Sequence, residues 1–142
     1  MIKNRYLLLA LAGLFALLTF LSFYFYWQEN GQMLTEETEQ ARVDGAQYAK
    51  TNNQQACLDT VIDKSQSCRD SNCTVALKNF LNSCFKNAEK SPDICNKVPS
   101  NHDYMNKVSW TVSTCRKAKV RNGNCTNIIN EMPLLCEIKT RH

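Results

Sequence analysis

The chain has 142 residues, eight cysteines, two histidines and a formal net charge of +4. With only four glycines and three prolines, the composition disfavours a loop-rich all-β knottin and leans towards helix. All eight cysteines lie between Cys57 and Cys136, a density typical of an oxidising compartment. These features predict an all-α protein with a disulfide-stapled domain.

A membrane-spanning helix is predicted near the N-terminus. Residues 1–5 are a short basic segment, and residues 6–27 contain no charged residue. At about 1.5 Å per residue this helix is roughly 33 Å long, enough to cross a hydrocarbon core of about 30 Å. It ends in FYFYW, an aromatic belt typical of the membrane–water interface. A cleaved signal peptide is the alternative, but its apolar core is shorter, about 7–15 residues, and ends in small residues. We therefore predict an uncleaved signal-anchor.

The charges on either side of this span predict its orientation. Lys3 and Arg5 precede it, whereas the charged residues that follow it most closely are acidic: Glu29, Glu36, Glu37 and Glu39. Because basic residues are retained in the cytoplasm, the rest of the chain is expected outside it. The bacterial inner membrane, with a periplasmic C-terminal domain, fits best. A eukaryotic secretory-pathway membrane with a lumenal domain is the alternative.

The remaining chain divides by composition. Residues 28–45 are predicted to be an acidic polar stalk, helical from Thr35 onward. Residues 46–138 are the disulfide-rich helical domain, and residues 139–142 are a tail.

The spacing of the cysteines predicts helices in this domain. Three pairs are eleven residues apart: Cys57 and Cys68, Cys73 and Cys84, and Cys125 and Cys136. Eleven residues are close to three helical turns, so both cysteines of a pair share one helix face. Apolar residues follow the same faces, as in amphipathic helices.

The sequence Asn-Cys-Thr occurs twice, and each copy is predicted to start a helix. Asn72 and Asn124 are the expected N-caps. Both copies are also sequons that could be glycosylated in a eukaryotic lumen, but the expected disulfides at their cysteines favour the capping interpretation.

Two further helices are predicted, so that the domain contains four helices arranged as two hairpins. One is predicted at residues 101–118, with Ser100 and Asp103 as a capping box. Its inward stripe is expected to comprise Tyr104, Val108, Thr111, Val112 and Cys115. The last helix carries Cys125 and Cys136, and Pro133 should kink it or make its end irregular.

Eight cysteines can form four disulfides in 105 different combinations, and helical geometry excludes most of them. Cysteines eleven apart in one helix are about 16 Å apart, whereas a disulfide requires less than about 7 Å between Cα atoms. In an antiparallel hairpin, positions near the loop face each other, and so do positions far from it. This nesting predicts Cys57–Cys84, Cys68–Cys73, Cys95–Cys136 and Cys115–Cys125.

The first hairpin reads Cys57-x10-Cys68 and then Cys73-x10-Cys84. This layout resembles the twin CX9C coiled-coil–helix proteins. The resemblance is topological and covers residues 57–84 only. The spacing is ten rather than nine, an anchor precedes the hairpin and a second hairpin follows, so we take no function from it.

No catalytic site, metal site or cofactor is predicted. Structural zinc sites use closely spaced cysteine pairs, and the shortest gap here is Cys68-x4-Cys73. Thiol–disulfide exchange is the one catalytic alternative, but no Cys-x-x-Cys motif supports it. His102 beside Asp103 is interpreted as an exposed residue at a helix start.

Two groups of residues are candidate binding surfaces. The basic cluster, Arg116, Lys117, Lys119 and Arg121, either stabilises a helix C-terminus or contacts anionic lipid, polysaccharide or an acidic partner. A second apolar stripe lies away from the cysteine seams and comprises Leu58, Ile62, Leu81, Phe85 and Trp110. It either packs the hairpins together or remains exposed as a docking patch.

These features predict a single-pass, membrane-anchored, non-catalytic interaction module outside the cytoplasm. We expect it to be an accessory or assembly subunit of an envelope complex with a protein partner in the membrane or periplasm. The alternative is a stand-alone binder of an anionic envelope ligand, or an inhibitor of another protein. No nucleic-acid partner is expected.

Overall fold

The computed structural model describes the backbone of residues 2–140 and the side chains of residues 4–138. Every regular element in this range is a helix, which confirms the all-α prediction. The chain divides into two compact units, the first ending at Glu36 and the second beginning at Glu37.

The first unit is the N-terminal part of helix α1, which runs from Ile2 to Tyr48. Its side chains from Tyr6 to Trp27 are exposed. Among the described helices, α1 is the one long and apolar enough to cross a membrane. The helix continues without a break through residues 28–45, which confirms helix from Thr35 onward and shows that residues 28–34 are helical as well.

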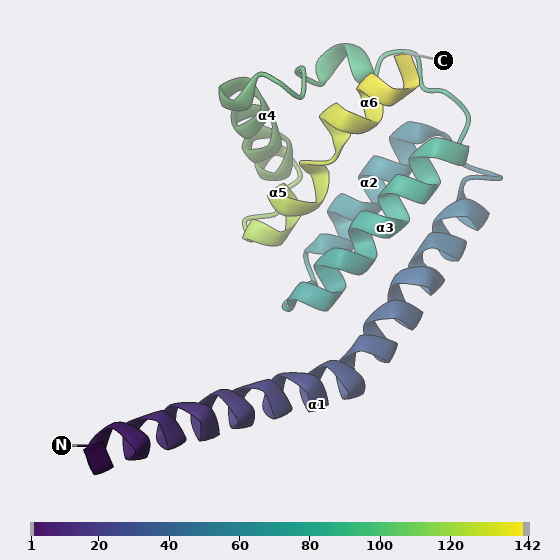
Figure 1. Cartoon of the computed structure of the whole chain (residues 1–142). Coiled ribbons are helices and arrows are strands. Elements are labelled where there is room, and N and C mark those ends of the chain that lie inside the picture. Colours follow the sequence, from purple (N-terminus) through teal and green to yellow (C-terminus); the bar gives the residue numbers. More distant parts are fainter. Residues whose placement is uncertain (1, 141–142) are drawn as a thin grey trace. The chain divides into compact units, whose positions relative to one another are not determined.

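The second unit contains the disulfide-rich domain (Figure 1). The last turns of α1 belong to it, because the compact unit begins at Glu37. Its other elements are α2 (Gln54–Ser65), α3 (Ser71–Asn87), the 3-10 turn η1 (Cys95–Lys97), α4 (Tyr104–Lys117), α5 (Gly123–Ile129) and α6 (Met132–Thr140).

The first hairpin, α2 and α3, begins each helix with a side-chain cap. The Asn53 side chain accepts a hydrogen bond from the Ala56 amide at 3.0 Å. The Asp70 carboxylate accepts one from the Cys73 amide at 2.8 Å. Asp70 and not Asn72 is therefore the N-cap of α3. The predicted cap is wrong by two residues because Asp70 already satisfies the free first-turn amide.

The second hairpin contains one helix more than predicted. The expected helix through Cys125 and Cys136 is divided, because α5 ends at Ile129 and α6 begins at Met132. Pro133 lies in the first turn of α6, where its missing N–H removes no helical hydrogen bond. The N-cap of α5 is Asn122, whose side chain accepts from the Cys125 amide at 3.2 Å. Asn124 is therefore not the cap.

The third predicted helix begins later than expected, at Tyr104. Its N-cap is Asp103, which accepts from the Asn106 amide at 3.2 Å. Ser100 does not form the predicted capping box. Its hydroxyl accepts from the His102 amide and donates to the Glu137 carboxylate at 3.1 Å, which ties this turn to α6 instead.

The two hairpins pack face to face. Helix α5 lies against both α2 and α3, and α6 lies against α3 (Figure 1). Leu58, Ile62, Leu81 and Phe85 are all buried in this shared core. The second apolar stripe therefore packs the hairpins together at these four positions. The alternative, that they form an exposed docking patch, is wrong.

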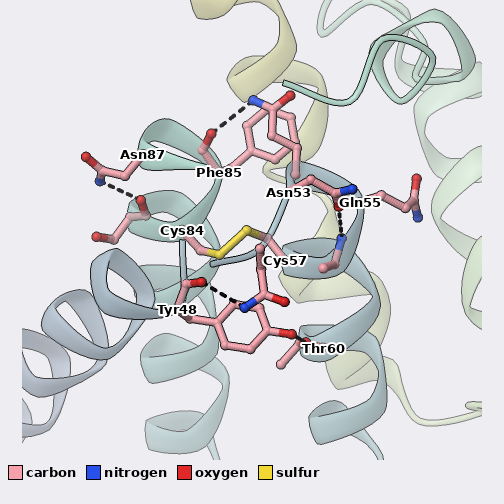
Figure 2. Close-up of a disulfide and its surroundings, with 12 residues drawn as sticks. Tyr48, Asn53, Gln55, Cys57, Thr60, Cys84, Phe85 and Asn87 are labelled. Carbon is pink, nitrogen blue, oxygen red and sulfur yellow. Dashed lines mark hydrogen bonds between the residues drawn. A yellow bond between two sulfur atoms is a disulfide. The ribbon is translucent and has the colours of Figure 1, made fainter. Parts of the chain in front are cut away.

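The four disulfides connect the same cysteine pairs that helical geometry predicted: Cys57–Cys84, Cys68–Cys73, Cys95–Cys136 and Cys115–Cys125. Figure 2 shows Cys57 and Cys84 joined between α2 and α3. Beside them, the Thr60 hydroxyl donates to the Tyr48 hydroxyl at 2.9 Å, which fixes the end of α1 against α2.

The two Asn-Cys-Thr copies have different surroundings. The Asn124 amide donates to the Cys68 carbonyl at 2.8 Å, and Asn122 donates to the Ser65 carbonyl at 2.8 Å. The second copy thus satisfies a carbonyl in the loop of the first hairpin, and the neighbouring Asn122 satisfies one at the end of α2. Asn72 in the first copy is exposed, and its side chain forms no hydrogen bond with any described residue.

This difference gives a matched test. Asn124→Ala should lower the free energy of unfolding by about 1–3 kcal/mol, because it leaves a half-buried carbonyl without its donor. Asn72→Ala, at the equivalent position of the other copy, should change it by less than about 0.5 kcal/mol. Denaturant unfolding followed by circular dichroism measures both. An equal loss of stability in both variants would contradict the hydrogen bond from Asn124 to the Cys68 carbonyl.

Candidate functional site: the surface of helix α4

The basic cluster lies at the C-terminal end of α4. Arg116 and Lys117 occupy its last turn, and Lys119 and Arg121 follow in the loop to α5. All four side chains are exposed. Within the described residues the ion pairs are Arg42–Glu39 and Lys78–Glu131, so none of the four cations is neutralised by a carboxylate of the chain. Positive charges at this end of the helix also interact favourably with the helix dipole.

Lys119 has a left-handed backbone conformation, with φ of 63°. It follows the C-cap Ala118 and allows a Schellman ending: the Val120 amide donates to the Cys115 carbonyl and the Lys119 amide donates to the Arg116 carbonyl, both at 2.9 Å. Val120 is buried beneath it. A lysine therefore occupies the position where glycine is usually found.

Replacing Lys119 with glycine should stabilise the domain by about 0.5–1 kcal/mol, because glycine adopts positive φ without the steric cost of a Cβ atom. Lys119→Ala is the matched control, since it removes the same charge but keeps the Cβ. Thermal unfolding of both variants measures the effect. A gain in the alanine variant as well would attribute it to charge rather than to backbone strain.

The outer face of α4 is more apolar than a solvated helix requires. Tyr104, Met105 and Val108 expose 73%, 75% and 41% of their surface. The predicted inward stripe is therefore only partly correct: Thr111 and Cys115 are buried, Val112 is half-buried, and Tyr104 and Val108 are exposed. The reason is length, because the facing helix α5 has 7 residues and α4 has 14.

This apolar face is continuous with the basic cluster. A shallow depression of about 610 Å³ runs along α4 and is lined by Val108, Ser109, Val112, Ser113, Arg116 and Lys117. A second depression of about 550 Å³ joins Arg116 to Arg121 across the α4–α5 loop. We call the combined surface of Tyr104, Met105, Val108 and the basic cluster the α4 face.

A different surface lies beside Trp110. A cleft of about 820 Å³ is formed between α4, the start of α2 and the segment around η1. Leu58 and Trp110, both in the second apolar stripe, line it. Trp110 is half-buried and packs against the core, so it differs from the four fully buried members of that stripe.

The candidate catalytic and metal-binding residues do not form a site. His102 is exposed in the turn before α4. Throughout the described residues, no group of three or more histidine, cysteine or acidic side chains is arranged to hold a metal ion. None of the cysteines is free in the structure.

The thiol content can be tested directly. A thiol reagent applied to the native protein should add no mass, because every cysteine is bonded. After unfolding and reduction, intact-mass measurement should show eight adducts. One or two adducts on the native protein would reveal an open bond and would favour thiol–disulfide exchange.

Comparisons with protein-family models, curated proteins and solved structures found no match to this chain. The location of the domain follows from the chain itself. A single candidate membrane helix near the N-terminus, combined with four disulfides, points to a membrane-anchored domain outside the cytoplasm.

Proposed function

We propose that this protein is a membrane-anchored, non-catalytic interaction module that acts as an accessory or assembly subunit of an envelope complex. The observation that carries the proposal is the α4 face, where an exposed apolar stripe adjoins four cations without an acidic partner in the described chain. Such a surface suits a protein that presents apolar side chains next to carboxylates.

The rigidity of the scaffold supports this proposal. Cys115, near the C-terminal end of α4, bonds Cys125 of α5, and Cys95 of η1, in the segment that leads to α4, bonds Cys136 of α6. A surface that is ordered before binding loses little conformational entropy on association. The α4 face is therefore suited to a stable protein contact.

The same proposal places the domain in a bacterial periplasm, with α1 as an uncleaved signal-anchor in the inner membrane. The basic residues before the span and the acidic residues after it support this orientation. An anchored domain is concentrated near other proteins of the same membrane, which strengthens a contact of moderate intrinsic affinity.

The test is site-specific crosslinking in cells. A photoreactive amino acid replaces Met105 in the full chain, and the matched control places it at Val75, an exposed apolar position on α3. We expect one membrane protein to crosslink from position 105, to be absent from position 75 and to co-purify in fixed stoichiometry. Met105→Asp should abolish co-purification, and the double variant Arg116→Glu/Arg121→Glu should weaken it.

The opposite result is equally clear. If position 105 yields no protein crosslink, or the same products as position 75, the α4 face is not a protein-binding surface. Circular dichroism of each variant shows whether a lost contact merely reflects unfolding.

The unpaired cations favour a second candidate, a stand-alone binder of an anionic envelope ligand or an inhibitor of another protein. Co-sedimentation with vesicles containing phosphatidylglycerol tests whether the anionic ligand is a lipid. Binding that falls between low and high salt, and falls again in Arg121→Ala, would support it. Vesicle binding unchanged by either condition would argue against it.

A further inference from the structure

We infer that the cleft beside Trp110 is a binding site for a carboxylate-bearing oligosaccharide. This site adjoins the α4 face and shares Lys117 with it, but it extends over the side of α4 that carries Trp110 and Asn106 rather than Met105 and Val108. The inference does not depend on the proposed protein contact.

The wall of the cleft supplies an apolar platform. Leu58 and Ile94 are buried at its base, and Val98 and Pro99 are half-buried beside Trp110. A pyranose ring has C–H groups on its faces and hydroxyls around its edge, so it stacks on an indole while remaining hydrogen-bonded at its rim. The Trp110 indole N–H forms no hydrogen bond within the described residues, so it is available to a sugar oxygen.

The rim of the cleft supplies the polar groups that such a ring needs. Short amide and hydroxyl side chains surround the platform: Gln55, Asn96, Ser100, Asn106, Ser109 and Ser113. Asn96, Ser109 and Ser113 form no side-chain hydrogen bond with any residue that the structure describes, so each is free to bond a ligand hydroxyl. The volume of about 820 Å³ suits a short oligosaccharide, since small-molecule sites occupy about 300–1,000 Å³.

The charges at the rim identify the type of sugar. Lys97 and Lys117 line the cleft and are exposed, and neither has an ion-pair partner in the described chain. Asp103 is the one carboxylate among the lining residues, and it already accepts hydrogen bonds from Asn106. The excess of positive charge complements a sugar acid rather than a neutral glycan.

The protein provides its own reporter for this binding. The chain has two tryptophans, Trp27 in the predicted membrane span and Trp110 in the cleft. The full chain carrying Trp27→Phe, in detergent, therefore emits from Trp110 alone. Titration with tetragalacturonate should change the intensity or wavelength of this emission saturably. Maltotetraose, a neutral tetrasaccharide, should bind about tenfold more weakly or not at all.

Variants locate the ligand. In calorimetry, Trp110→Ala should weaken tetragalacturonate binding about tenfold or more, as for an aromatic anchor, and Trp110→Phe should restore part of the loss. Asn96→Ala and Lys97→Ala alter exposed side chains and should each weaken binding with unchanged thermal unfolding. Lys86→Ala, an exposed lysine of α3 outside the cleft, is the matched control and should have no effect.

Three results would overturn the inference. Tetragalacturonate that causes no saturable change in Trp110 emission and no heat excludes the site. Equal affinity for maltotetraose excludes the acidic class. Binding that is lost in Arg121→Ala, a residue outside the cleft, but retained in Lys97→Ala assigns the sugar to the basic cluster instead.

Discussion

Replacing both cysteines of the Cys57–Cys84 disulfide with alanine should lower the free energy of unfolding by about 3–5 kcal/mol. The bond closes a separation of 27 residues, for which the loss of chain entropy in the unfolded state alone corresponds to about 3.5 kcal/mol. Both sulfurs are fully buried, so the double variant also loses core contacts. Denaturant unfolding of the full chain in detergent measures the difference.

The Cys68–Cys73 disulfide provides the matched control. It closes a separation of only 5 residues, and Cys73 is half-buried. The double alanine variant there should cost about 2 kcal/mol. If both variants lose the same stability, the long bond does not act by restricting the unfolded chain.

Gly45→Val should separate the end of α1 from α3 and lower the free energy of unfolding by about 2–3 kcal/mol. A Cβ atom at Gly45 would lie 2.5 Å from the Phe80 carbonyl oxygen and 3.1 Å from the Cys84 amide nitrogen. Both contacts are with backbone, which cannot rotate away. The close approach also allows the Ser83 hydroxyl to donate to the Arg42 carbonyl at 2.7 Å.

Hydrogen exchange localises this effect. Amides of residues 41–48 should lose protection in Gly45→Val, while those of α5 should not. Gly123→Val is the matched control, because a Cβ atom there meets no atom within 4 Å, and it should change stability by less than about 0.5 kcal/mol. Unchanged protection at residues 41–48 would show that α1 and α3 can adjust to the added side chain.

Three of the four disulfides were predictable from the geometry of antiparallel helical hairpins, and Cys95, which precedes α4 in η1, takes the remaining partner. A separation of eleven residues places both cysteines on one face and too far apart to bond, which leaves the nested pairs. The pairing tolerates errors of a few residues in helix ends. This is why it holds although the helix expected to carry Cys125 and Cys136 is divided near Asn130.

The helix caps were not predictable at the same level. Three consecutive residues at the start of α3 are all of types that are common at N-caps: Asp70, Ser71 and Asn72. The N-cap preferences of these residue types therefore do not identify which of them is the cap. Tertiary contacts distinguish the second copy: Asn124 donates to Cys68, which lies in the other hairpin. A bond across 56 residues leaves no local signal in the sequence.

The exposed face of α4 was not predictable for a related reason. The periodicity of Tyr104, Val108 and Cys115 identifies one side of a helix, but it does not give the length of the helix that covers it. Because α5 is short, the first turns of α4 extend past it and remain uncovered. The cleft beside Trp110 likewise depends on the path of the chain around η1, which has no periodic pattern.

No disulfide crosses from one hairpin to the other: two bonds lie within Cys57–Cys84 and two within Cys95–Cys136. In the topology proposed above, the segment nearest α1 crosses the membrane first, so the first four cysteines leave the cytoplasm ahead of the fifth and can pair among themselves. Each group then selects among 3 pairings rather than 105, which reduces the need for an isomerase. A protease that cuts at the exposed Lys90 would leave two oxidised pieces that separate in denaturant without any reductant.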